Sequence, residues 1–124
     1  ATLTEALARV ELEPFAEERA GTFSRGMAQR LNLARILLQS PRLLLLDEPG
    51  TGLDARSLAL LHREIAAARE RGAGVVWISH DVASDVARAD RIAAIENRTL
   101  GYCGPADAYP GPGAGAPSAK EASC

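Results

Sequence analysis

The amino-acid sequence predicts an α/β fold with a parallel sheet at its core. Two short apolar runs, residues 43–46 and 75–78, are bounded by prolines, glycines and polar residues, as buried strands are. A segment with helical periodicity lies between the runs, and another follows the second run. Strand, helix, strand, helix is the element order typical of parallel sheets.

Length and composition restrict the class of protein. The chain has 124 residues, which corresponds to one domain or part of one. Its 47% hydrophobic and 24% charged residues are typical of soluble globular proteins, and no apolar run reaches the ~18–20 residues of a membrane span. A net charge of -2 gives little attraction for phosphate backbones, so no nucleic-acid partner is expected. No secretory signal is visible, and a cytoplasmic location is expected.

Two helices are expected before the first strand. Apolar residues recur at every third or fourth position over residues 2–10, which is the spacing of a helix with one buried face. Ser24 is a good N-cap for a helix over residues 25–39, which Pro41 ends. The buried stripe of this helix is expected to contain Met27, Leu31, Ala34 and Leu38.

The segments after the first strand are also predicted from local signals. Asp54 is expected to cap a helix that ends at Gly72, and a short helix over residues 82–89 follows the second strand. Residues 91–95 and 99–103 are expected to form a hairpin around Asn97 and Arg98. The Gly, Pro, Ala and Ser content of residues 106–124 predicts a disordered tail.

An acidic pair and a histidine follow the two expected strands. Asp47 and Glu48 come directly after the first apolar run, and His80 comes after the second. In open parallel sheets the reactive groups lie beyond the carboxyl ends of the strands. Adjacent carboxylates there suit a Mg²⁺ site, in which one holds the ion and the other orients or deprotonates a water molecule. The alternatives are an acidic pair that caps a helix or lies on the surface, and a surface histidine.

The start of the helix after Ser24 is a candidate anion site. A helix N-terminus presents backbone N–H groups and partial positive charge, both of which favour anions. Gly26 and the exposed amides of the helix start form such a site, and Arg25 adds positive potential. Taken alone, however, Ser24 and Asp54 are N-caps and nothing more.

Four motifs occur in the order and spacing of one protein family. They are Phe23-Ser24-Arg25-Gly26-Met27, the strand from Leu43 to Pro49, Thr51-Gly52-Leu53-Asp54, and Ile78-Ser79-His80-Asp81. In this order they resemble the signature motif, the Walker B strand, the D-loop and the switch-histidine loop of the ATP-binding-cassette (ABC) ATPases. The resemblance covers residues 3–104. It implies part of a P-loop NTPase fold over residues 1–105, with a helical subdomain at about 1–40 and half of the core sheet at about 41–105.

The resemblance implies catalytic roles for three of these residues. Asp47 is expected to hold Mg²⁺ through water, and Glu48 to be the general base that polarises the attacking water. His80 is expected to contact the γ-phosphate of ATP and stabilise the transition state. The implied activity is ATP hydrolysis coupled to transport across a membrane.

The resemblance also implies an interface between two nucleotide-binding subunits. Ser24 and Gly26 are expected to donate hydrogen bonds to the γ-phosphate of ATP held by the opposite subunit, with Arg25 beside them. Asp54 is expected to link the two active sites across the dimer. Membrane-spanning transporter subunits are the other implied partners, which would hold the protein at the inner face of the cell membrane.

Two departures from the family pattern affect this interpretation. Arg25 and Met27 replace the first Gly and the Gln of the usual signature ending, a form similar to exporter-type ATPases, including those for haem export in cytochrome c maturation. No Gly-Lys-Ser/Thr loop is present, since Lys120 is the single lysine. The sequence is therefore expected to be the C-terminal half of a nucleotide-binding domain, inactive in isolation.

Two other functions remain open at this point. One is a soluble ABC-type ATPase of translation or DNA repair, and the other is a non-catalytic remnant that acts as an interaction module. The intact Asp47, Glu48 and His80 argue against the remnant. The absence of a long coiled-coil pattern and of a second cassette argues against the soluble ATPase.

Overall fold

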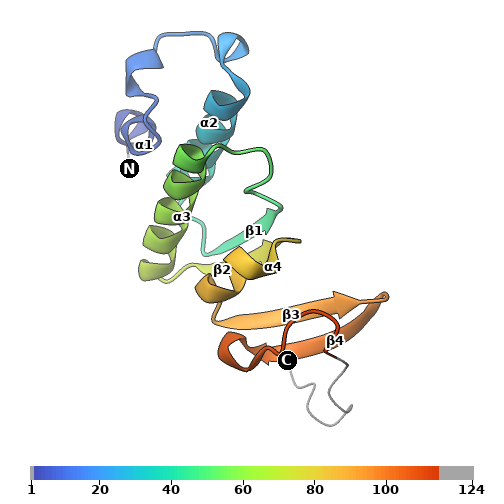
Figure 1. Ribbon diagram of the computed structural model, residues 1–124. Helices are drawn as coiled ribbons and strands as arrows, with labels where there is room; N and C mark the ends of the chain where they lie inside the picture. The colour runs from blue at the N-terminus through green and yellow to red at the C-terminus, as the bar shows by residue number, and fades with distance from the viewer. Residues whose placement is uncertain (1, 115–124) are drawn as a thin grey trace. The chain divides into compact units, whose positions relative to one another are not determined.

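A computed structural model describes residues 2–114 of the chain (Figure 1). The chain divides into two compact units, the first ending at Ile78 and the second beginning at Ser79. Among residues 2–114, no helix is long and apolar enough to cross a membrane.

The first unit contains three helices and two strands. Its elements are α1 (Leu3–Arg9), α2 (Arg25–Leu38), β1 (Leu43–Asp47), α3 (Ala55–Glu70) and β2 (Gly74–Ile78), with single 3-10 turns at Glu13–Phe15 and Ala20–Thr22. The helices α1 and α3 pack on α2. The core consists of buried side chains from these elements, namely Ala6, Leu7, Val10, Leu12, Leu33, Ala34, Leu44, Leu46, Leu60, Leu61, Ile65 and Ala68.

The strands β1 and β2 form the predicted parallel pair. Leu44 lies opposite Val75, and Asp47 lies opposite Ile78. Because side chains alternate along a strand, Leu44 is buried whereas its neighbour Leu45 is 71% exposed. The sheet therefore has one face in the core and one exposed apolar face, which consists of Leu43, Leu45, Val76 and Ile78.

The second unit contains one short helix and a hairpin. Its elements are α4 (Val82–Asp85), β3 (Arg91–Glu96) and β4 (Thr99–Pro105), with 3-10 turns at Val86–Arg88 and Ala106–Ala108. The antiparallel hairpin is the predicted one, and Asn97 and Arg98 form its turn with φ of 50° and 64°. Positive φ at both central residues is the geometry of a type I′ turn.

The helix expected over residues 82–89 is shorter than predicted. It ends at Asp85 and continues as a 3-10 turn. The side chain of Arg88 donates a hydrogen bond to the carbonyl oxygen of Ser84 at 2.6 Å. That carbonyl is the acceptor that an α-helix would offer to the backbone N–H of Arg88, so the side chain takes its place. Of the tail expected to be disordered, residues 115–124 lie outside the described part of the chain.

Candidate functional site

The acidic pair lies at the carboxyl end of β1, as the sequence predicts. Asp47 is the last residue of the strand, and the backbone N–H of Glu48 donates to the carbonyl oxygen of Ile78 in β2 at 2.9 Å. Both carboxylates are exposed. The hydroxyl of Thr51 donates to Oε2 of Glu48 at 3.3 Å, which ties the glutamate side chain to the loop that follows.

Glu48 has an unusual backbone conformation. Its φ is +44°, in the left-handed region that costs a non-glycine residue free energy. Such strain persists where the surrounding structure holds it, and it is frequent at functional sites. Here the bond to Ile78 and the bond from the N–H of Thr51 to the carbonyl of Glu48, 3.1 Å, hold it.

The predicted N-cap of α2 is confirmed. The Ser24 hydroxyl oxygen accepts a hydrogen bond from the N–H of Met27 at 3.2 Å, and the Ser24 carbonyl accepts from Ala28 at 2.9 Å. Other N–H groups of the first turn have no acceptor within the helix, as at any helix start. Gly26 lies beside α3, because a Cβ at this glycine would be 3.9 Å from Oγ of Ser57.

Arg25 joins the start of α2 to the loop after the acidic pair. A Cβ placed on Gly52 would lie 3.1 Å from Nη2 of Arg25, so the guanidinium group covers this glycine closely. Gly52 has φ +74°, which also favours glycine at this position. The segments 23–27 and 51–54, which are far apart in sequence, therefore meet in the structure.

Asp54 caps α3 with a charged group. Its carboxylate accepts a hydrogen bond from the N–H of Ser57 at 2.7 Å. Hydrogen bonds from Ser57, backbone first, lower the pKa of this exposed carboxyl, and the positive charges of Arg30 and Arg56 lower it further. Asp54 is accordingly ionised at neutral pH.

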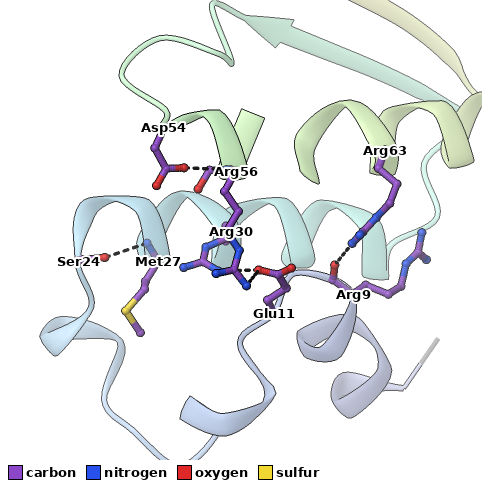
Figure 2. A network of polar contacts seen from close by, with 9 residues as sticks. Arg9, Glu11, Ser24, Met27, Arg30, Asp54, Arg56 and Arg63 are labelled. Carbon is purple, nitrogen blue, oxygen red and sulfur yellow. Dashed lines mark hydrogen bonds and ion pairs between the residues drawn. The ribbon is translucent and has the colours of Figure 1, made fainter. Parts of the chain in front are cut away.

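Sequence reasoning missed an ion-pair network between α2 and α3 (Figure 2). Oε2 of Glu11 lies 2.8 Å from Nη2 of Arg56 and 3.6 Å from Nη1 of Arg30. On the same side of the unit, Arg9 forms an ion pair with the buried Glu64, and Arg63 donates to the carbonyl of Arg9 at 2.7 Å. No spacing signal points to Glu11, because it lies in the irregular connection after α1.

The acidic pair borders a pocket of about 270 Å³. The pocket lies among α2, the end of β1, and the start of α3. Its lining combines the two carboxylates with polar and apolar side chains, including Gln29, Asn32, Ile36, Leu53 and Ser57.

The structure places His80 in the second unit, exposed, at the second residue after β2. The residue after it, Asp81, caps α4 by accepting from the N–H of Ser84 at 3.4 Å. The acidic pair, the two helix caps and the pocket all lie in the first unit, whereas His80 lies in the second.

The residues at the end of β1 fit Mg²⁺ bound together with a phosphate. Among the described residues no three histidine, cysteine, aspartate or glutamate side chains gather into a metal site. Mg²⁺ needs fewer protein ligands, since it keeps several waters and is bound by one or two carboxylates plus substrate phosphates. Exposed Asp47, with Glu48 beside it, provides that donor set.

Comparison with known proteins identifies relatives of one kind. Residues 1–51 match the family model described as ABC transporter. The chain is 37% identical over 102 residues to a spermidine/putrescine import ATP-binding protein, PotA 1, of Pseudomonas aeruginosa, covering 82% of the chain and 28% of that protein. It is 45% identical over 93 residues to the aliphatic sulfonates import ATP-binding protein SsuB of Mycobacterium avium, covering 74% of the chain and 37% of that protein.

A solved structure agrees with these matches. An ATP-binding subunit of an ABC transporter superposes with a TM-score of 0.76 and 27% identity, covering 85% of this chain and 44% of that one. The two relatives above are import proteins, so the expected likeness to exporters, including haem exporters, finds no support. The chain spans about a third of the length of these relatives. In sequence and in fold the chain therefore corresponds to part of an ATP-binding protein of the ABC transporter family.

Proposed function

We propose that this chain is part of the ATP-hydrolysing subunit of an ABC importer. It supplies the carboxylates at the end of β1 that take part in hydrolysis, and the signature segment, residues 23–27, that faces the opposite subunit. One observation carries the proposal. The acidic pair Asp47 and Glu48 ends a parallel strand, and the loop that follows it is tied through Gly52 to Arg25 at the start of α2. The carboxylates that we assign to water activation and the helix start that we assign to phosphate binding therefore lie in one unit.

The acidic pair divides the work of hydrolysis. Asp47 would hold Mg²⁺ through water, and the bound ion would supply charge neutralisation for the phosphates of ATP. Glu48 orients the attacking water and accepts its proton, while the Thr51 hydroxyl at 3.3 Å fixes the carboxylate. His80, which follows β2, contacts the γ-phosphate and stabilises charge in the transition state.

The other candidate residues act across a dimer of nucleotide-binding subunits. Ser24 and Gly26, at the N-terminus of α2, donate hydrogen bonds to the γ-phosphate bound by the opposite subunit. Arg25 adds positive charge there. Asp54 links the two active sites at the interface. Membrane-spanning subunits are the remaining partners and hold the dimer at the inner face of the cell membrane.

Substitution of the general base tests the proposal. In a complete ATP-binding subunit that carries this chain, Glu48→Gln keeps the shape of the side chain but cannot accept a proton. General-base catalysis contributes ~10²- to 10⁴-fold, so hydrolysis should fall by that order. ATP should remain bound between two subunits, and size-exclusion chromatography with ATP should show a persistent dimer.

The matched control is Glu70→Gln, which removes an exposed carboxylate at the far end of α3. This variant should hydrolyse ATP at the rate of the unmodified subunit. Near-normal turnover in Glu48→Gln would show that Glu48 is not the base and would leave the acidic pair as a metal-binding or capping feature.

A further inference from the structure

Glu11 occupies a backbone position that favours glycine. The helix α1 ends in a Schellman motif, in which the N–H of Leu12 bonds to the carbonyl of Leu7 at 2.8 Å and the N–H of Glu11 bonds to that of Ala8 at 3.0 Å. Glu11 is the left-handed residue of this motif, with φ +59°. Glycine takes this conformation without a steric cost and glutamate does not.

The side chain of Glu11 offers a reason for a glutamate at this position. Its carboxylate contacts Arg56 in the first turn of α3 and Arg30 in the second turn of α2, at 2.8 and 3.6 Å. The Arg30 side chain is only 20% exposed, so its charge is partly removed from water and needs a nearby anion. Figure 2 shows the three side chains converging from three segments of the unit.

The same two arginines also interact with Asp54 electrostatically. After the hydrogen bonds from Ser57, their positive charges help to lower the pKa of that carboxyl, so Arg30 and Arg56 interact with two anions, Glu11 and Asp54. A chain of alternating charges thus runs from the end of α1 to the N-terminus of α3. This chain of charges crosses α2 at Arg30, in the second turn of the helix. Ser24 precedes α2, and Gly26 lies in its first turn.

We propose that Glu11 is a positioning residue that fixes the N-terminus of α2 relative to the N-terminus of α3 by binding Arg30 and Arg56 together. The inference rests on the proposed function, in which Ser24 and Asp54 must reach the opposite subunit at the same time. Without the Glu11 carboxylate, Arg30 and Arg56 lose the group that joins them, and Asp54 is the remaining anion of the network. The anion-binding end of α2 then loses its alignment with Asp54.

The first test separates alignment from stability in a complete ATP-binding subunit that carries this chain. Glu11→Gln removes the charge, whereas Glu11→Gly removes the charge and also relieves the left-handed backbone. Both variants should raise the ATP concentration for half-maximal dimerisation about 3- to 10-fold, which is in the lower part of the coupling range for charged neighbours in one network. Glu11→Gly should nevertheless unfold at the same temperature as the unmodified subunit or above it.

The matched control is Glu18→Gln, an exposed carboxylate in the same connection between α1 and α2. It should leave the dimerisation midpoint unchanged. A purely structural role for Glu11 would give a different result, because dimerisation would then weaken only in variants that also unfold more easily.

A charge exchange provides the second test. Glu11→Arg alone should weaken dimerisation more than Glu11→Gln, since it brings a third positive charge to the cluster. Combination with Arg56→Glu should recover part of the loss by restoring an ion pair between the same positions, while Arg30 still repels the arginine at position 11. Failure of the double variant to recover, together with an unchanged midpoint in Glu11→Gln and Glu11→Gly, would overturn the inference.

The Glu48→Gln variant distinguishes this inference from the proposed function. If Glu48→Gln traps an ATP-bound dimer while the Glu11 variants dimerise at the normal ATP concentration, only the positioning role is wrong. If Glu48→Gln traps no dimer and retains turnover, the proposed function itself fails.

Discussion

The N-termini of α2 and α3 lie in the same unit and follow similar sequence signals, yet they are capped by different chemistry. At α2 the neutral hydroxyl of Ser24 accepts from the N–H of Met27 at 3.2 Å. At α3 the carboxylate of Asp54 accepts from the N–H of Ser57 at 2.7 Å. Each helix start carries partial positive charge, but only that of α3 has an anion built into its cap.

This difference separates a helix start whose positive charge is uncompensated by its cap from one whose charge is compensated. The positive end of α2 is uncompensated by its cap, and Arg25 beside it adds a full positive charge. The positive end of α3 already interacts with its own carboxylate, and hydrogen bonds from Ser57, helped by the charges of Arg30 and Arg56, lower the pKa of that carboxyl. A phosphate is therefore expected at α2 and not at α3.

The largest expected effect comes from giving α2 the cap of α3. Ser24→Asp should keep the helix well capped, but its carboxylate would face the γ-phosphate of the opposite subunit. Two like charges about 4 Å apart repel by ~4 kcal/mol near a protein surface, so ATP-dependent dimerisation should weaken on the order of 10²- to 10³-fold. Titration of the dimer with ATP in the complete subunit measures this loss.

The neutral isostere Ser24→Asn separates charge from shape. Asparagine caps a helix as well as aspartate does, so this variant should stay close to the unmodified subunit in stability and weaken dimerisation far less than Ser24→Asp. Equal dimerisation by the aspartate and asparagine variants would show that no phosphate approaches α2.

A smaller effect is expected from removing the cap of α2. Ser24→Ala leaves the N–H of Met27 without its side-chain acceptor, which costs about 1 kcal/mol of stability at a typical N-cap. The midpoint of thermal unfolding should fall by about 2–6 °C for a chain of this size. An unchanged midpoint would mean that water replaces the hydroxyl without loss.

The smallest effect is a difference in pH dependence between the two caps. The pKa of Asp54 is lowered in the folded state, so its ionised form stabilises the fold above the ordinary pKa of an aspartate. That contribution disappears as the pH falls through the lowered pKa. The difference in unfolding midpoint between the unmodified chain and Asp54→Asn should therefore be greatest at neutral pH and vanish in acid. The difference for Ser24→Ala should stay constant, because a hydroxyl does not titrate in this range.

The local elements of the fold were predictable because their causes are local. Ser24 and Asp54 precede helices and cap them, as small polar residues at helix starts do. The apolar runs became a parallel pair, and the acidic pair lies at the end of β1. The nucleotide roles of these residues remain predictions, since position alone does not establish them.

The contacts that tie the site together were not predictable from the sequence. Glu11 meets Arg30 and Arg56, and Arg25 covers Gly52, only because helices distant in sequence pack side by side. Long charged side chains have no periodicity that reveals their partners. The helix α4 was overestimated for a related reason, since the side chain of Arg88 competes for a backbone acceptor.

The pairing of the strands has a consequence for how the chain folds. Each residue of β1 pairs with a residue 31 positions later, whereas the hairpin of β3 and β4 closes through the two residues Asn97 and Arg98. Hairpins form in ~1–10 μs, but distant pairings wait until the intervening chain is ordered. The helix α3 lies in that intervening chain, so β1 and β2 must close a longer loop than the hairpin does. The end of β1 that carries the acidic pair is therefore expected to pair with β2 more slowly than the hairpin closes.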